Sequence, residues 1–594
     1  MENRAVKFHE AGYFFVLLCL GVFLFILFFH QGIETEDVWL HLSTGRWILQ
    51  HHQMPHEDVF PFLNEKTPYL CHEWISSVFI YSLYKIQGFL GLKIFRPLFF
   101  LLSLGIFFFY ARRRIPFSFL TFLILLISYA FFQRSLLRPD ILNVLFVQLF
   151  LMVLFSYQDN PKPSKLFLLP LMGVFWVNMH MMGAFVYGEA LIFIFLMAGW
   201  ARGFQQGQAL AWSLLAFMAV FMINPYGFEG VLFPYKVLLF PKYYGLYQMM
   251  GMMKELQAPI DIFFSLDYLY FLILMAVPVV LFFLDKKKDL VLVLLYGVAL
   301  LMFLSMARNC IFFTVVAAYV MARQSQNLGL MKIWGSWSWR PWVDFVLCFF
   351  VVFVSVTQAY NFFHEKVYFN GQIHQAMLLD TNPYVIKSIN LLKDNGVKGP
   401  VFNSSPLGGV ILWFDYPALK PFDDGRHLDY GRVHDEINVY LNPSKEWDKA
   451  QKKYGFKIVI LSQGNISEQK VIRYLCTRMD WQFIAVNGPF VIFVKKGEVH
   501  LSDDLAKFEE RLKSEVLSDS DRSKLNFFLN QRSRPVLDQF LWPSAYRVDT
   551  FSTGLALMGL GYKEAAAKNF IQALEISDQP YMREIVAESM GQFK

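Results

Sequence analysis

Charged residues are scarce in this chain, at 17% of its 594 positions, whereas hydrophobic residues make up 56%. Soluble domains carry roughly a quarter charged residues, so this composition excludes an ordinary soluble globular protein. It predicts a membrane protein.

Neither a cleavable leader nor a nucleic-acid surface is expected from this sequence. The first apolar stretch follows Arg4 and Lys7, as in a signal peptide, but it continues to His30 without a small-residue cleavage site. We interpret it as a retained membrane span. The net charge of +7 comes without a basic stripe interleaved with aromatic residues, so nucleic acid is not an expected partner.

Cysteines are few and scattered, and no pair has the spacing of a metal site. No disulfide can be argued from them, and no metal-binding residue is assigned.

Long apolar runs, in contrast, are abundant before residue 360. About eleven approach the roughly 20 residues that a bilayer requires. They centre on 13–30, 89–110, 117–133, 141–157, 166–178, 183–200, 209–223, 262–284, 289–306, 309–322 and 343–360.

Lysine and arginine gather in alternate short loops, which predicts that these loops are cytoplasmic. With the N-terminus inside, the basic residues of these loops are Arg112, Arg113, Arg114, Lys162, Lys165, Arg202, Lys286, Lys287, Lys288, Arg323, Lys332 and Arg340. An odd number of spans then leaves everything after Tyr360 outside the cytoplasm.

We expect a polytopic α-helical membrane protein with three zones: a membrane body over 1–360 with an outer loop at 31–88, an extracytoplasmic α/β domain over 375–500, and a helical tail over 501–594. Strand-like runs at 399–403, 457–462, 481–486 and 490–495 alternate with helical patterns, which indicates the α/β domain. The tail pattern is typical of one tetratricopeptide unit or of an ordinary helical hairpin. Its residues are Leu560, Gly561, Tyr562, Ala566, Phe570, Ala573 and Pro580.

The first outer loop is rich in acids and holds five of the thirteen histidines. Apolar residues at helical spacing over 37–49 predict a helix along the membrane interface, with Asp37 and His41 four residues apart on one face. Asp37 could accept a proton from an incoming hydroxyl as a general base. The alternative is an ordinary helix N-terminus, with Thr35, Glu36 and Asp37 as capping residues.

Other polar residues fall at the predicted outer ends of spans. They are Arg134, Arg138, Asn178, His180, Asn224, Lys254, Glu255 and Arg308. Arginines there can bind a phosphate through forked, charge-assisted hydrogen bonds, although a single arginine more often reaches to lipid headgroups.

These residues resemble the motifs of bacterial GT-C glycosyltransferases that use polyprenyl-phosphate sugars. In that set the first outer loop reads Asp-x-Trp-x-His-Leu-x-x-Gly-x-Trp, which corresponds here to Asp37, Trp39, His41, Leu42, Gly45 and Trp47. Further matches, in order, are His72-Glu73-Trp74, Arg138-Pro139, Asn178-x-His180, Asn224-Pro225-Tyr226-Gly227, the span from Arg308 and Asp424-Gly425-Arg426. The resemblance covers about 10–500, and it departs from the pattern at Leu40, Met181, Met182 and Leu256.

The resemblance implies transfer of a sugar from a polyprenyl-phosphate donor to a hydroxyl of a glycan, lipid or protein, at the outer face of a bacterial inner membrane. Asp37 would be the catalytic base and His41 would orient it or the acceptor. The expected substrate-binding residues are His72, Glu73, Arg138, Asn178, His180, Glu255 and Arg308, with Arg138 and Arg308 at the departing phosphate. No cofactor is assigned, although a divalent cation could assist there. Asp424 and Arg426 would shape the acceptor side or pair internally.

Two other function classes stay open from the residues alone. A transporter or flippase for a lipid-linked or anionic substrate could also use polar residues among many spans, although its charges would lie nearer the bilayer midplane. A non-catalytic membrane scaffold would use the outer domain and tail to bind partners.

Overall fold

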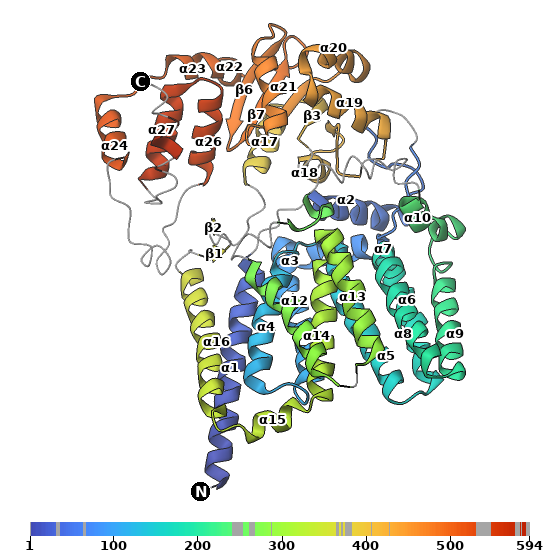
Figure 1. Cartoon of the computed structure of the whole chain (residues 1–594). Coiled ribbons are helices and arrows are strands. Elements are labelled where there is room, and N and C mark those ends of the chain that lie inside the picture. The colour runs from blue at the N-terminus through green and yellow to red at the C-terminus, as the bar shows by residue number, and fades with distance from the viewer. Residues whose placement is uncertain are drawn as a thin grey trace. The chain divides into compact units, whose positions relative to one another are not determined.

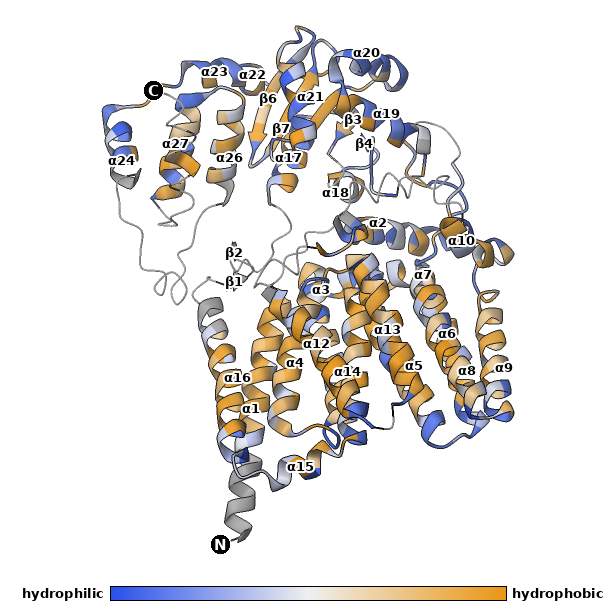
Figure 2. Ribbon diagram, viewed as in Figure 1, coloured by the Kyte–Doolittle hydropathy of each residue, from blue (hydrophilic) through white to orange (hydrophobic). Residues whose placement is uncertain are grey.

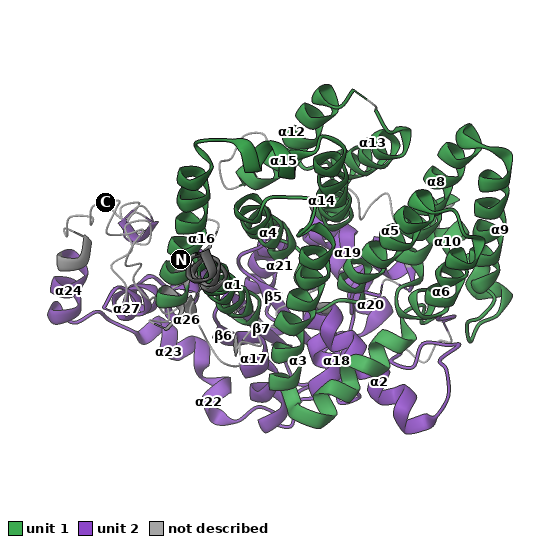
Figure 3. Cartoon of the chain, turned by 90° about the horizontal axis from the view of Figure 1, so that it is seen from below, with its two compact units in different colours: residues 1–31, 70–360 green, residues 32–69, 361–594 purple. Residues whose placement is uncertain are grey.

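The computed structural model describes residues 2–30, 36–62, 67–239, 254–260, 268–286, 288–363, 367–369, 372–374, 383–404, 407–426, 428–529, 548–575, 583, 585–587 and 589. The chain is mostly helical, with several apolar helices long enough to span a membrane and a small sheet (Figure 1). It divides into two compact units, residues 1–31 with 70–360 and residues 32–69 with 361–594 (Figure 3). Residues 32–69, from the first predicted outer loop, therefore group with the second unit.

The first unit is a helical bundle whose helices follow the predicted apolar runs. Its longer helices are α1 (Glu2–His30), α3 (Trp74–Ala111), α4 (Phe117–Phe132), α5 (Asn143–Asp159), α6 (Leu168–Met179), α8 (Glu189–Arg202), α9 (Phe204–Val220), α10 (Phe228–Leu239), α12 (Leu269–Leu284), α13 (Leu290–Ser305), α14 (Cys310–Asn327), α15 (Leu330–Ser336) and α16 (Arg340–Phe363). Short helical turns are η1 (Pro139–Leu142), η2 (Pro163–Phe167), α7 (Met181–Gly183), the π-helical η3 (Ala184–Gly188), η4 (Lys254–Leu256) and η7 (Ala307–Asn309).

Five helical stretches among the described residues are long and apolar enough to cross a membrane. They are Gly12–Phe29, Trp74–Ala111, Pro139–Asp159, Met181–Arg202 and Arg340–Thr357. Shorter apolar helices are Phe117–Phe132, Leu269–Leu284 and Leu290–Ser305. Figure 2 shows hydrophobic residues along these helices. Each predicted apolar run falls at least partly on a helix, and residues 262–267 of one run lie outside the described residues.

Basic residues of the predicted cytoplasmic loops meet at one end of this bundle. Arg323 donates to Asp159 at 2.8 Å, Arg202 donates to Asp289 at 2.8 Å, and Arg114 donates to Gln326 at 2.8 Å. The loops that the charge pattern assigns to one side therefore do lie together.

The second unit contains a five-stranded sheet flanked by helices. Its strands are β3 (Gly399–Asn403), β4 (Leu419–Pro421), β5 (Ile458–Ser462), β6 (Trp481–Asn487) and β7 (Phe490–Lys495), in the order β4-β3-β5-β7-β6. β3 pairs in parallel with β4 and β5, and β7 pairs antiparallel with β5 and β6. The four predicted strands are confirmed, and β4, of three residues, was not predicted.

The helices of the second unit begin with α2 (Glu36–His51), the predicted helix of the first outer loop. The others are α17 (Pro383–Asp394), α18 (Gly408–Phe414), α19 (Tyr430–Leu441), α20 (Pro443–Tyr454), α21 (Ile466–Cys476), α22 (Asp503–Ala506), α23 (Phe508–Ser514), α24 (Asp519–Leu529), α26 (Val548–Gly559) and α27 (Lys563–Leu574). A two-stranded sheet joins β1 (Val367–Phe369) to β2 (Gln372–His374). In the tail, α26 and α27 pack together around Phe570, as a helical hairpin requires, and Pro580 lies outside the described residues.

Candidate functional site

The structure brings seven of the predicted site residues into the first unit, each at the end of a helix or in a short helical turn. His72 and Glu73 precede α3, Arg138 precedes η1, Asn178 and His180 close α6, Glu255 lies in η4 and Arg308 in η7. These ends gather charge because the apolar helix interiors exclude it.

Glu73 and His180 form a buried acid–imidazole pair. The His180 Nε2 lies 3.2 Å from the Glu73 Oε1, and the two side chains are 8% and 18% exposed. The Gly183 backbone N–H donates to the His180 Nδ1 at 2.9 Å. Because Nδ1 is thus an acceptor, the neutral ring carries its proton on Nε2 and donates it to Glu73. The pair therefore fixes the orientation of the Glu73 carboxylate.

His72 lies beside the same carboxylate. Its Nε2 is 3.8 Å from the Glu73 Oε1, and its ring stacks on Phe233 with centroids 4.8 Å apart. Burial, together with the charge of Arg308, lowers the pKa of His72 to about 4. His72 is therefore neutral at pH 7 and adds no positive charge to the site.

Asn178 braces this part of the site. Its Oδ1 accepts the Trp74 indole N–H at 2.8 Å, and its Nδ2 donates to the backbone carbonyls of Val174 and Ile223 at 2.8 and 2.7 Å. Both amide hydrogens are consequently used between α6 and neighbouring segments. These bonds favour a structural role for Asn178 over direct contact with a substrate.

The arginines form a second group, paired with two carboxylates. The Arg134 Nη2 lies 2.9 Å from the Asp140 Oδ2, and its Nη1 contacts Glu255, whose Oε2 is also 3.3 Å from the Arg138 Nη1. Burial alone would raise the pKa of Glu255, but the charges of Arg134, Arg308 and Arg138 outweigh burial and lower it. Glu255 is thus ionised, and it holds two guanidinium groups together.

Arg308 joins the two groups electrostatically. It interacts through charge with Glu255, Asp140 and His72, and Asp140 interacts in turn with His180. Three arginines thus lie near the three carboxylates Glu73, Asp140 and Glu255. Guanidinium groups beside hydrogen-bonding carboxylates suit a ligand that has both an anionic group and hydroxyls.

The comparisons with protein-family models and with curated proteins give no match to this chain.

Three members of the cluster were not among the predicted site residues. Arg134 was noted only as a span-end charge, whereas Asp140 directly follows Arg138-Pro139, and that adjacency could have pointed to it. Tyr187 lies in the π-helical turn η3, its hydroxyl donates to the Asn309 Oδ1 at 2.8 Å, and its ring stacks on Phe312. Nothing in the spacing of apolar residues predicts a π-helical turn, which is often found at functional sites.

Asp37 and His41, the predicted catalytic residues, lie on α2 in the second unit. His41 is 7% exposed and Asp37 is half-buried. The helix packs on α18, where the Trp39 and Phe414 rings lie 5.4 Å apart. The four-residue spacing that sets Asp37 and His41 on one face is retained, because α2 is helical over both positions.

A divalent cation has no ready ligand set in the part of the chain that the structure describes. No group of three or more histidine, cysteine, aspartate or glutamate side chains there could hold a metal ion. The arginines are the groups positioned to meet negative charge.

Proposed function

We propose that this chain is a multi-pass membrane glycosyltransferase of the GT-C type, which moves a sugar from a polyprenyl-phosphate donor to an acceptor hydroxyl outside the cytoplasm. One observation carries the proposal: the cluster of Glu73, His180, Glu255 and three arginines at the helix ends of the first unit. Such a cluster matches a lipid-linked sugar phosphate, which presents one anionic group between an apolar chain and a hydroxylated ring.

The arginines would receive the phosphate. Arg138 and Arg308 are the main candidates, because Arg134 already contacts both Asp140 and Glu255. Fixed positive charge lowers the barrier when it lies where negative charge develops, which here is the oxygen of the departing phosphate. Glu255 contacts the guanidinium groups of Arg134 and Arg138, keeps them aligned and so limits their reorganisation.

The sugar would be recognised through the Glu73–His180 pair. The carboxylate of Glu73 can accept hydrogen bonds from sugar hydroxyls, while the His180 Nε2–H donates to it and holds it oriented. His72 contributes its ring as a neutral, partly exposed neighbour.

The transfer balances without an external oxidant or reductant. The acceptor oxygen forms a bond to the anomeric carbon as the bond from that carbon to the phosphate oxygen breaks, and the bonding pair leaves on the phosphate. The acceptor proton passes to the Asp37 carboxylate and then to solvent. The assignment of Asp37 rests on the resemblance of Asp37, Trp39, His41 and Trp47 to the GT-C motif.

The membrane and its lipids would hold the donor, and the basic loops orient the chain. We propose a bacterial inner membrane with the N-terminus in the cytoplasm and residues after 360 outside it, because the basic residues gather at one end of the bundle.

The test is sugar transfer by the purified full-length chain in nanodiscs, with a panel of polyprenyl-phosphate sugars and hydroxyl acceptors. Asp37→Asn is expected to lower kcat by at least about 100-fold, the contribution of a general base, with little change in the KM for the donor. Asp394→Asn, which changes an exposed acid on α17 of the same unit, is the matched control and keeps full activity.

Three outcomes would overturn parts of this proposal. Full activity in Asp37→Asn would exclude Asp37 as the base, and loss of activity in Glu73→Gln alone would move that role to Glu73. In sealed proteoliposomes, movement of intact donor across the bilayer, with no glycoside formed from any donor, would support a transporter.

A further inference from the structure

The segment that follows α2 forms part of the outer domain core. Phe62 is 3% exposed, and its ring lies 5.3 Å from the ring of Phe422 and 6.1 Å from those of Tyr454 and Phe456. The Tyr416 hydroxyl donates to the Pro61 carbonyl at 3.5 Å, and the Phe60 ring meets the Tyr416 ring edge-on. Residues separated by more than 300 positions therefore share one core.

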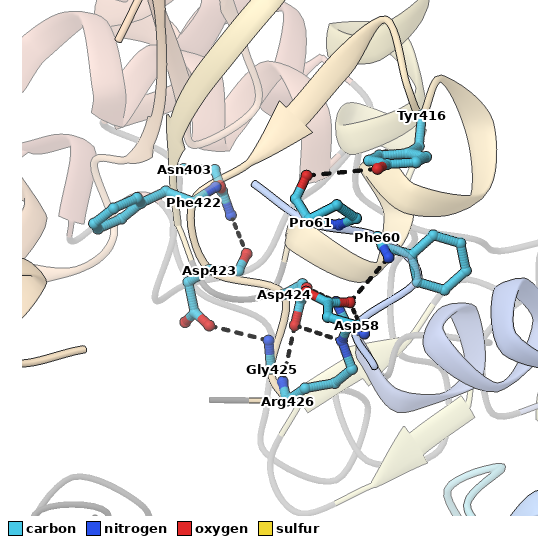
Figure 4. Close-up of polar contacts among 10 residues, drawn as sticks. All are labelled: Asp58, Phe60, Pro61, Asn403, Tyr416, Phe422, Asp423, Asp424, Gly425 and Arg426. Atoms are coloured by element: carbon cyan, nitrogen blue, oxygen red, sulfur yellow. Dashed lines mark hydrogen bonds and ion pairs between the residues drawn. The ribbon is translucent and has the colours of Figure 1, made fainter. Parts of the chain in front are cut away.

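Arg426 is the buried charge at the centre of this contact (Figure 4). Its Nη1 lies 2.6 Å from the Asp58 Oδ1 and its Nη2 lies 2.5 Å from the Asp424 Oδ2, while its side chain is 3% exposed. The guanidinium carbon also lies 5.4 Å from the Phe60 ring centroid and 5.3 Å from that of Tyr69. One side chain thus contacts its own turn and two aromatic rings and one acid of the first outer loop.

The turn that carries Arg426 is held rigidly by its own hydrogen bonds. Asn403 accepts from the Phe422 N–H at 2.8 Å and donates to the Asp423 carbonyl at 2.7 Å. The Asp423 side chain accepts from the Gly425 N–H at 3.0 Å, and Gly425 has a positive φ of 80°. Arg426 therefore leaves the turn in a fixed direction.

The same turn contacts the helix on which α2 packs. A Cβ on Gly408, the first residue of α18, would lie 1.9 Å from the Asp423 carbonyl oxygen. At the sixth residue of α18, the Trp413 ring lies under the Arg46 guanidinium at 4.3 Å, and Arg46 donates to the Trp413 carbonyl at 3.4 Å. The turn, α18 and α2 form one continuous set of contacts.

Burial makes the charges of this contact interdependent. Burial would raise the pKa of Asp424, but Arg426 outweighs burial and lowers it, so this acid stays ionised. A buried charge is tolerated only with its partners, because removing one partner leaves the other uncompensated. The ion pairs consequently hold both sides of the contact in place.

We propose that Arg426 is a positioning residue that holds segment 36–62, and with it Asp37 and His41, against the outer domain. Its effect on catalysis rests on the proposed function, whereas its effect on the segment does not. The alternative is that Arg426 only closes its own turn with Asp424. That alternative gives the contact to Asp58 no role.

The test compares hydrogen exchange in the full-length chain, in detergent, for Asp58→Asn, Asp424→Asn and Arg426→Gln. Asp58→Asn leaves Phe62 and the turn unchanged, and it is expected to speed amide exchange in 36–62 about tenfold or more without affecting β5 to β7. Adding Asp58→Asn to Arg426→Gln should speed amide exchange in 36–62 little further, since both substitutions remove the same interaction. Arg478→Gln, which breaks the partly exposed pair with Asp480 in the same unit, is the control and leaves 36–62 unchanged.

A second readout separates positioning from general stability. Asp58→Asn is expected to lower kcat about tenfold with an unchanged KM for the donor, because the donor residues lie in the first unit. Arg426→Lys should keep only part of the wild-type kcat, since an ammonium group cannot bridge both acids and stack on the rings as a guanidinium does.

The proposal would be overturned if Arg426→Gln sped amide exchange only in 422–426 and if Asp58→Asn exchanged at the wild-type rate in 36–62. If the wild type transfers no sugar, the proposed function fails, yet the exchange experiment still decides the role of Arg426.

Discussion

Gly183 is the residue on which the Glu73–His180 pair depends most directly. A Cβ there would lie 2.1 Å from the Asn143 Oδ1 and 2.3 Å from the His180 Nδ1, so both side chains would have to move. We predict that Gly183→Ala lowers the stability of the chain by about 1–3 kcal/mol, the usual cost of overpacking, and reduces sugar transfer.

Thermal unfolding in detergent and the transfer assay measure the two effects. Gly105→Ala is the matched control, since nothing lies within 4 Å of a Cβ at that position of α3. Equal behaviour of the two variants would contradict the close packing at His180.

His72 makes the first unit sensitive to acid. Its pKa is lowered to about 4 by burial, so its stabilising effect is complete above its ordinary value of 6.5 and is lost as the pH falls from 6.5 towards 4. We predict that His72→Asn flattens the dependence of the melting temperature on pH in this window. The effect is moderate, because the side chain keeps 30% exposure. An unchanged pH profile would show that His72 does not titrate as its burial requires.

At this scale the sequence predicted only in part which polar residues lie close together. His72, Glu73, His180, Arg138, Glu255 and Arg308 do gather in the first unit, because polar residues at the ends of apolar helices have few other positions. Asp140 was missed since its pairing with Arg134 depends on the distance across a turn, which no periodicity reveals. The role of Asp37 remains a prediction.

At the scale of elements, α2 shows what an apolar pattern predicts and what it leaves out. Val38, Leu42 and Ile48 predicted the helix, and all three are buried. The pattern could not identify α18 as a packing partner, because a helical stripe shows which face is covered but not by what.

This packing can be tested at Trp39. The residue is 3% exposed and meets Phe414, so we predict that Trp39→Ala weakens α2 by about 3–5 kcal/mol and speeds hydrogen exchange in α18. Leu49→Ala, at a position of the same helix that is 37% exposed, is the control and should have a small effect. Unchanged exchange in α18 would contradict the packing.

At the scale of the whole molecule, composition and charge predicted a helical membrane protein, and its apolar helices fit that class. Four strands of the larger sheet in the second unit were predicted from short strand-like runs, whereas β4 was not. The sequence did not predict that residues 32–69 group with the second unit, because this grouping depends on contacts between segments more than 300 residues apart, such as Asp58 with Arg426.

The proposed orientation predicts which residues a reagent can reach. In a cysteine-free background, Asp504→Cys should react with a membrane-impermeant maleimide on intact cells, whereas Lys162→Cys should react only after lysis. Both positions are exposed, so access depends on the side of the membrane alone. The reverse pattern would contradict the charge-based topology.

The most direct measurement of the central claim is the stoichiometry of transfer by the purified full-length chain in nanodiscs. We predict that one polyprenyl phosphate is released for each glycoside formed, and that Arg308→Gln lowers kcat by about 100-fold or more, the effect of removing a group that stabilises developing charge. Wild-type turnover in Arg308→Gln, or no coupled release from any polyprenyl-phosphate sugar, would contradict it.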